Sequence, residues 1–155
     1  AALAIILYGQ TIDLSVDREL RVPLYRAAIY RHEAFGILAL AAICLRLIWR
    51  LVDRRPALPS TMRRWEMVAS HLAHGALYTL AIAACILGWC QVSSNGGLVQ
   101  VFGWTGLPAL TGKDAHLHAV IEVWHEWISW ALVALVAVHI GAALKHHFEI
   151  GRAHV

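Results

Sequence analysis

The sequence has little charge: charged residues make up 15% of its 155 amino acids, whereas soluble domains average about 25%. Hydrophobic residues make up 59%, and the mean hydropathy is +0.60. This composition excludes an ordinary soluble domain, and it excludes a long disordered region because disorder requires low hydrophobicity. The formal net charge of +3 is too small to indicate a nucleic-acid partner. The sequence therefore indicates an integral membrane protein that crosses the bilayer a few times.

The sequence also lacks the motifs that would assign metal or redox chemistry directly. It contains no Cys-x-x-Cys-His, which excludes covalent attachment of a c-type haem, and no His-Glu-x-x-His of a zinc protease. Its three cysteines lie inside apolar stretches, as small core residues do, rather than forming a disulfide framework: Cys44, Cys85 and Cys90.

Three apolar segments are long enough to cross a bilayer, which takes about 20 residues in a helix. They run from Ala27 to Trp49, from Met67 to Val92 and from Ala119 to Leu144. A fourth stretch, Ala1–Gly9, is too short to cross, and we interpret it as the exit half of a helix that begins before Ala1. A soluble N-terminal segment is the alternative. We therefore predict an all-α fold, a transmembrane four-helix bundle with a truncated first helix, which forms one domain over residues 1–155.

The basic residues predict the orientation of these spans. The connection from Trp49 to Trp65 holds five arginines against a single aspartate, so the positive-inside rule places it in the cytoplasm. The Gln91–His118 connection is polar and nearly uncharged, so we place it outside the membrane, together with the Gln10–Arg26 segment.

Histidines within or at the edges of the spans are the main functional signal, because ionisable side chains in a membrane are costly and mark functional sites. His125 and His139 lie 14 residues apart on the last helix. They therefore project from nearly the same face, about 21 Å apart along the helix axis. His32 lies near the outer start of its own helix and shares a depth with His125. Two imidazoles from facing helices at equal depth can supply both axial ligands of a haem iron.

The deeper histidine, His139, also needs a partner, and the spacing does not choose one. His71 and His74 at the cytoplasmic start of their helix are candidates, and so is a histidine on the missing half of the first helix. Gly36, one turn after His32, leaves room for a flat macrocycle or for close helix packing.

Two interpretations without haem are open at this point: a metal or proton transporter and a structural anchor. The cysteines do not accompany the histidines at matching depths, and no Asp or Glu stands at mid-membrane to relay protons. The pattern favours electron transfer through two haems.

Several longer motifs are typical of a known family. They are Tyr30–Gly36 around His32, Arg46–Arg50, His71–His74, Trp124–Glu126 around His125, and Ala143–Phe148 after His139. From Tyr30 onward the chain resembles the bacterial cytochrome b561 family. These are four-helix membrane proteins with two haems, related to the cytochrome b subunits of hydrogenases and formate dehydrogenases.

The resemblance implies two b-type haems and assigns their ligands. The outer haem would take His32 and His125, and the inner haem would take His139 and a first-helix histidine. No histidine precedes His32 in this sequence, so we expect that last ligand to lie before Ala1, with His74 as the alternative. The family also implies a multi-pass protein of the bacterial inner membrane.

The remaining expectations concern the cytoplasmic side. Arg46 and Arg50 either pair with haem propionates or anchor the helix by the positive-inside rule. Ubiquinone is expected near the inner haem, where His74 or His146 would exchange its proton.

Two functions remain open. The first is a stand-alone oxidoreductase that passes electrons from an outer-face donor, such as superoxide, to ubiquinone. The second is the membrane anchor and electron conduit of a larger dehydrogenase, held to a redox partner subunit.

Overall fold

The protein, represented by a computed structural model, is described over residues 18–53, 64–103 and 106–150. These residues form three long helices and no strand: α2 (Arg18–Val52), α3 (Arg64–Ser94) and α4 (Ala115–Ile150). The all-α prediction is confirmed. The predicted half-helix Ala1–Gly9 lies outside the described residues, as does most of the arginine-rich connection between α2 and α3.

Each helix contains an apolar stretch long enough to cross a membrane: Pro23–Val52, Met67–Ser94 and Ala115–Lys145. These stretches contain the three predicted spans. In their most apolar windows, 0%, 6% and 0% of the residues are buried inside the protein. The apolar side chains therefore face outward, as they do in a protein whose surroundings are lipid, and every backbone group in the helix interior bonds within its own helix.

All three helices are longer than their predicted spans, and the largest extensions are at the start of α2 and the end of α4. α2 begins at Arg18 and includes Pro23, although we predicted the span to start at Ala27. α4 continues past Leu144 to Ile150. The added turns are rich in charged residues, so hydropathy alone does not include them. Pro23 is the sixth residue of α2, beyond the first four amides that have no intrahelical partner, so it removes one helix hydrogen bond close to the helix start.

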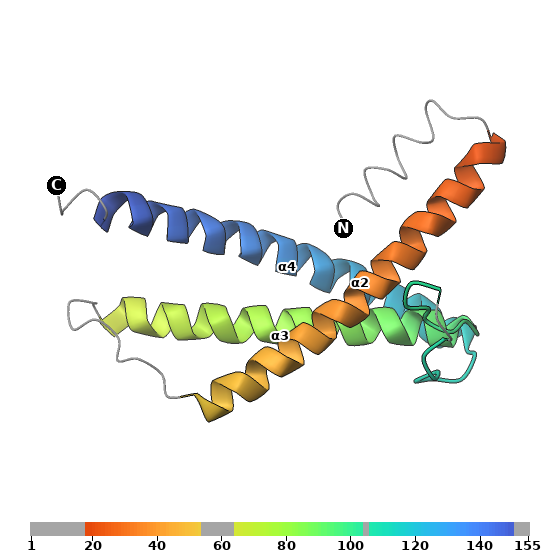
Figure 1. Ribbon diagram of the computed structural model, residues 1–155, viewed down its shortest axis with the longest axis horizontal. Helices are drawn as coiled ribbons and strands as arrows, with labels where there is room; N and C mark the ends of the chain where they lie inside the picture. Colours follow the sequence, from red (N-terminus) through yellow and green to blue (C-terminus); the bar gives the residue numbers. More distant parts are fainter. Residues whose placement is uncertain (1–17, 54–63, 104–105, 151–155) are drawn as a thin grey trace.

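The helices meet in one crossing. α3 and α4 run side by side in opposite directions, and α2 crosses obliquely over them (Figure 1). Each helix contributes one small or branched apolar side chain that is almost fully buried: Ala34 on α2, Ala84 on α3 and Ile121 on α4. Small residues at such a crossing allow the backbones to approach closely.

The outer connection between α3 and α4 folds back on the helix ends and is tied to them by hydrogen bonds. The hydroxyl of Ser93 donates to the Trp89 carbonyl at 2.9 Å and accepts from the Leu110 amide at 3.1 Å. The Trp89 indole donates to the Pro108 carbonyl at 3.1 Å. Asp114 Oδ1 accepts the amides of His116 and Leu117 and so caps the start of α4. The outer ends of α3 and α4 are thereby fixed relative to each other.

Candidate haem sites

The structure brings His32 of α2 and His125 of α4 together at the outer level. Their ring centroids are 6.2 Å apart, and the ring planes are inclined by 75°. An imidazole nitrogen binds a first-row metal such as zinc at about 2.0–2.1 Å, so two rings that share one ion have centres roughly 6 Å apart. The observed separation therefore suits two ligands on opposite sides of one iron.

The surroundings of His125 fit the same interpretation. Its Nδ1 is buried and has no hydrogen-bond partner within the described part of the chain, which is costly for a polar atom unless a further group binds the ring. Gly88 of α3 lies directly against this ring: a Cβ there would stand 3.1 Å from His125 Cε1. At Gly36, by contrast, a Cβ would meet no described atom within 4 Å. Gly36 therefore leaves open space beside His32, whereas Gly88 makes room for His125 itself.

Two further groups lie close to this outer level. Glu33 Oε2 is buried without a partner among the described residues. The Phe35 ring, one turn beyond His32, packs edge-on against Phe102 of the outer connection, with centroids 5.8 Å apart. The connection therefore covers α2 near the outer histidine pair.

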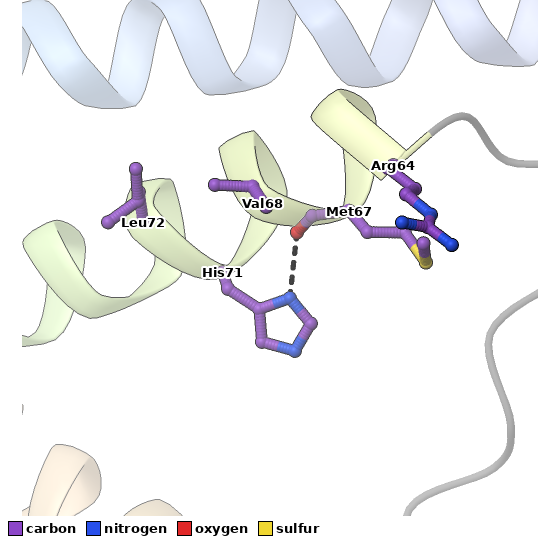
Figure 2. Close-up of a pocket in the computed structure, with 5 residues that line it drawn as sticks. All are labelled: Arg64, Met67, Val68, His71 and Leu72. Atoms are coloured by element: carbon purple, nitrogen blue, oxygen red, sulfur yellow. Dashed lines mark hydrogen bonds between the residues drawn. The ribbon is translucent and has the colours of Figure 1, made fainter.

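At the inner level, the structure places His139 of α4 beside His74 of α3. Their ring centroids are 5.3 Å apart, and Ser70 Oγ lies 3.5 Å from His74 Nδ1. His71, the other candidate partner, has a different contact. Its Nδ1 lies 2.7 Å from the Met67 carbonyl oxygen on its own helix (Figure 2).

The predicted arginines approach the same region from α2. Arg46 Nε donates a hydrogen bond to Tyr78 Oη at 2.9 Å, and Arg50 Cζ lies 5.7 Å from the centroid of the same ring. Tyr78 stands one turn after His74 on α3, so it shares that helix face.

The sequence analysis did not select Tyr78 or Gly88. Tyr78 could have been found from its spacing, because it follows the candidate histidine His74 by four residues. Gly88 had only the weak signal of an isolated glycine in an apolar helix, which indicates packing in general.

The other predicted site residues are placed as follows. His146 belongs to α4, but its side chain lies outside the described part of the structure. The three cysteines are free thiols. Across residues 18–53, 64–103 and 106–150, no three His, Cys, Asp or Glu side chains gather where they could hold a metal ion unaided.

An open groove runs along the inner end of α3 (Figure 2). Its volume is about 460 Å³, and it is open to the surroundings because α3 alone supplies its lining. The residues that line it are Arg64, Met67, Val68, His71 and Leu72. The carbonyl of Met67 can only accept, so His71 Nδ1 carries the proton and Nε2 is left as an acceptor.

Comparison with known proteins decides the family. The family model for prokaryotic cytochrome b561 matches residues 1–152. The chain belongs to the prokaryotic cytochrome b561 family. Cytochrome b561 homolog 2 of Escherichia coli K12 is 34% identical over 125 residues, which cover 80% of this chain. Cytochrome b561 homolog 1 of the same organism is 30% identical over 119 residues, or 76% of this chain. The aligned segments span 66% of each relative, just under two thirds of its length.

The resemblance drawn from the motifs is therefore confirmed. Members of the cytochrome b561 family are integral membrane proteins that bind b-type haem and carry electrons across the bilayer. The paired histidines of this chain lie at two levels of its membrane-length helices.

Proposed function

We propose that this cytochrome b561 transfers electrons across the bacterial inner membrane, between a donor at the outer face and the ubiquinone pool, through two b-type haems. When bound, each haem supplies a one-electron iron couple whose potential is set by its ligands and surroundings. The observation that carries the proposal is the pairing of His32 with His125 at 6.2 Å, with His139 about 21 Å deeper on the same helix face.

In this proposal, His32 and His125 hold the outer haem. They come from two helices that cross at this depth, and the buried, unpartnered Nδ1 of His125 fits a ring that is committed to a further group. Gly88 keeps the space that the His125 ring occupies.

In this proposal, His139 would supply one ligand of the inner haem. The contact with His74 makes that residue a close neighbour of the site, but its 5.3 Å separation is shorter than the spacing of the outer pair. Arg46 and Arg50, which approach this level from α2, bind the propionates through charge-assisted hydrogen bonds.

Ubiquinone accepts the electrons at the inner side, where it also needs protons. His74, beside His139, and His146 are the residues proposed to exchange them. The surface hollow at the start of α3 supports a site on this side, because it combines apolar side chains with His71 Nε2, which can accept a hydrogen bond from the O–H of the quinol product (Figure 2).

The first test is a haem count per chain on the full-length protein, with a reduced-minus-oxidised spectrum. We expect two haems with b-type bands. Superoxide generated at the outer face of proteoliposomes should reduce them, and added ubiquinone should reoxidise them. A protein that carries two haems but takes no electrons from superoxide would require another donor, and a protein without haem would end the proposal.

One observation favours the second function, an electron-conduit subunit of a larger dehydrogenase. The outer connection exposes apolar side chains on the side where a donor subunit would dock: Leu98 is 54% exposed and Phe102 58%. Copurification of an iron–sulfur or cytochrome c subunit from native membranes would support this alternative over a diffusible donor.

A further inference from the structure

Tyr78 contacts two arginines that have no acidic partner among the described residues. Its hydroxyl accepts the Arg46 Nε–H at 2.9 Å, and its ring lies 5.7 Å from Arg50 Cζ, within the range of a cation–π contact. Neither guanidinium forms an ion pair with a described carboxylate. Two neighbouring positive charges within a membrane span are costly unless an anion neutralises them.

The geometry of the Arg46 contact determines how such an anion can bind. Arginine has five N–H donors, and the one on Nε is already used by Tyr78. The four donors on the two terminal nitrogens remain, and they form the planar fork that binds a carboxylate through two parallel hydrogen bonds.

The depth of the cluster fits the inner haem. Arg46 follows His32 by 14 residues on α2, as His139 follows His125 on α4, so each lies about 21 Å further along its own helix axis toward the inner side. Tyr78 is also one turn from His74, whose ring contacts His139. A carboxylate at this level is within the region that the inner haem would occupy.

We propose that Tyr78 is a positioning residue that holds the Arg46 guanidinium with its terminal fork toward a propionate of the inner haem and keeps Arg50 beside it. This inference rests on the proposed inner haem. Positive charge at the propionates stabilises the reduced state relative to the oxidised one, because reduction adds a negative charge. Loosening Arg46 should therefore lower the midpoint potential of the inner haem.

The experiment is a redox titration of the full-length protein and its variants in nanodiscs of phosphatidylcholine. Tyr78→Phe should change the oxidised-to-reduced ratio of the inner haem about threefold at fixed ambient potential, or about 28 mV at about 59 mV per tenfold. Arg46→Gln should change it about tenfold, or about 59 mV. The double variant should match Arg46→Gln, because Tyr78 acts through Arg46. Tyr25→Phe, the same change in a half-exposed tyrosine at the outer end of α2, should leave both potentials unchanged.

Arg46→Lys gives the same test if Tyr78→Phe does not accumulate, since it keeps the charge and removes the Nε–H. A wild-type protein with a single haem would overturn the proposed function and this inference together. Two haems with an unchanged inner potential in Tyr78→Phe, or additive effects in the double variant, would overturn the role of Tyr78 alone. A shift that appears only after anionic lipid is added would assign the cluster to a lipid headgroup and would also overturn it.

Discussion

The two ends of this cytochrome are organised differently. At the outer end, the chain itself fixes the site: Ser93 and Asp114 tie the connection to α3 and α4, and Phe102 of that connection contacts α2. At the inner end, α2 diverges from α4 (Figure 1), and the contacts are polar ones between separate helices. Arg46 reaches Tyr78, and His74 reaches His139.

The comparison indicates which interactions hold the outer histidine pair and which hold the inner one. At the outer level, both proposed ligands belong to this sequence, and helix packing brings their rings to 6.2 Å. At the inner level, His139 contacts the half-buried ring of His74 on α3, and the nearby contact from α2 is the polar one between Arg46 and Tyr78. We therefore expect the outer haem to respond to packing changes and the inner haem to respond to changes in charge.

Removing one ligand should separate the two levels most strongly. His125→Ala should abolish the outer haem and leave about one haem per chain, since the remaining imidazole of His32 has no opposite partner. His139→Ala should abolish the inner haem instead. The pyridine haemochrome assay and the reduced-minus-oxidised spectrum measure both outcomes.

His116→Ala is the matched control for these variants, because His116 is an exposed histidine at the start of α4 with no ring contact to another helix. It should keep two haems. Retention of both haems by His125→Ala would show that the proposed pairing is wrong.

Packing at the outer level should be sensitive to a single methyl group. Gly88→Ala places a Cβ 3.1 Å from His125 Cε1, which is tighter than an ordinary contact, so the ring must shift. Overpacking of this kind typically costs about 1–3 kcal/mol. We expect weaker retention of the outer haem and an altered low-spin electron paramagnetic resonance signal.

Gly75→Ala, next to His74 on the same helix, is the control, because its Cβ would meet no described atom within 4 Å. It should leave both haem signals as they are. If Gly88→Ala and Gly75→Ala changed the haem signals equally, the outer level would not be more tightly packed than the inner one.

The sequence predicted the fold and the outer pair because both follow from periodicity. Apolar length gives the spans, and a 14-residue spacing returns to one helix face whatever else the protein does. Periodicity does not identify the partner of His139, because the lateral position of α3 depends on how the three helices pack. Their buried apolar residues are Ala34, Ala84 and Ile121. Tyr78 was missed for the same reason: its contact with Arg46 joins two helices whose angle the sequence does not state.

The hydrogen bonds of the outer connection provide a smaller test of the same comparison. In Ser93→Ala, the Leu110 amide loses its acceptor inside the folded connection. A neutral hydrogen bond of this kind contributes about 0.5–1.5 kcal/mol, and Leu110 is 48% exposed, so water can replace part of the loss. We expect a lower Tm and faster proteolysis of the outer connection, with no change in the inner haem potential.

Ser129→Ala on α4 is the appropriate comparison, because the structure gives its half-buried hydroxyl no hydrogen bond among the described residues. Its Tm should stay close to that of the wild type. If Ser93→Ala changed the inner potential as much as the Tm, the two ends would not be independent.

The smallest effect is expected at the inner groove, where the proposed quinone would bind. His71→Gln keeps a polar side chain but removes the acceptor Nε2 that the Met67 bond leaves exposed (Figure 2). A single neutral hydrogen bond contributes about 0.5–1.5 kcal/mol, so the KM for ubiquinol, whose O–H donates to this nitrogen, should rise roughly two- to tenfold when the reaction is run from quinol, while both haem spectra stay unchanged. Leu72→Ala, on the lining but without a polar atom, should change KM less than His71→Gln. The reverse order would show that quinone contacts this groove through apolar packing alone, and an unchanged KM in both variants would move the quinone site elsewhere on the inner side.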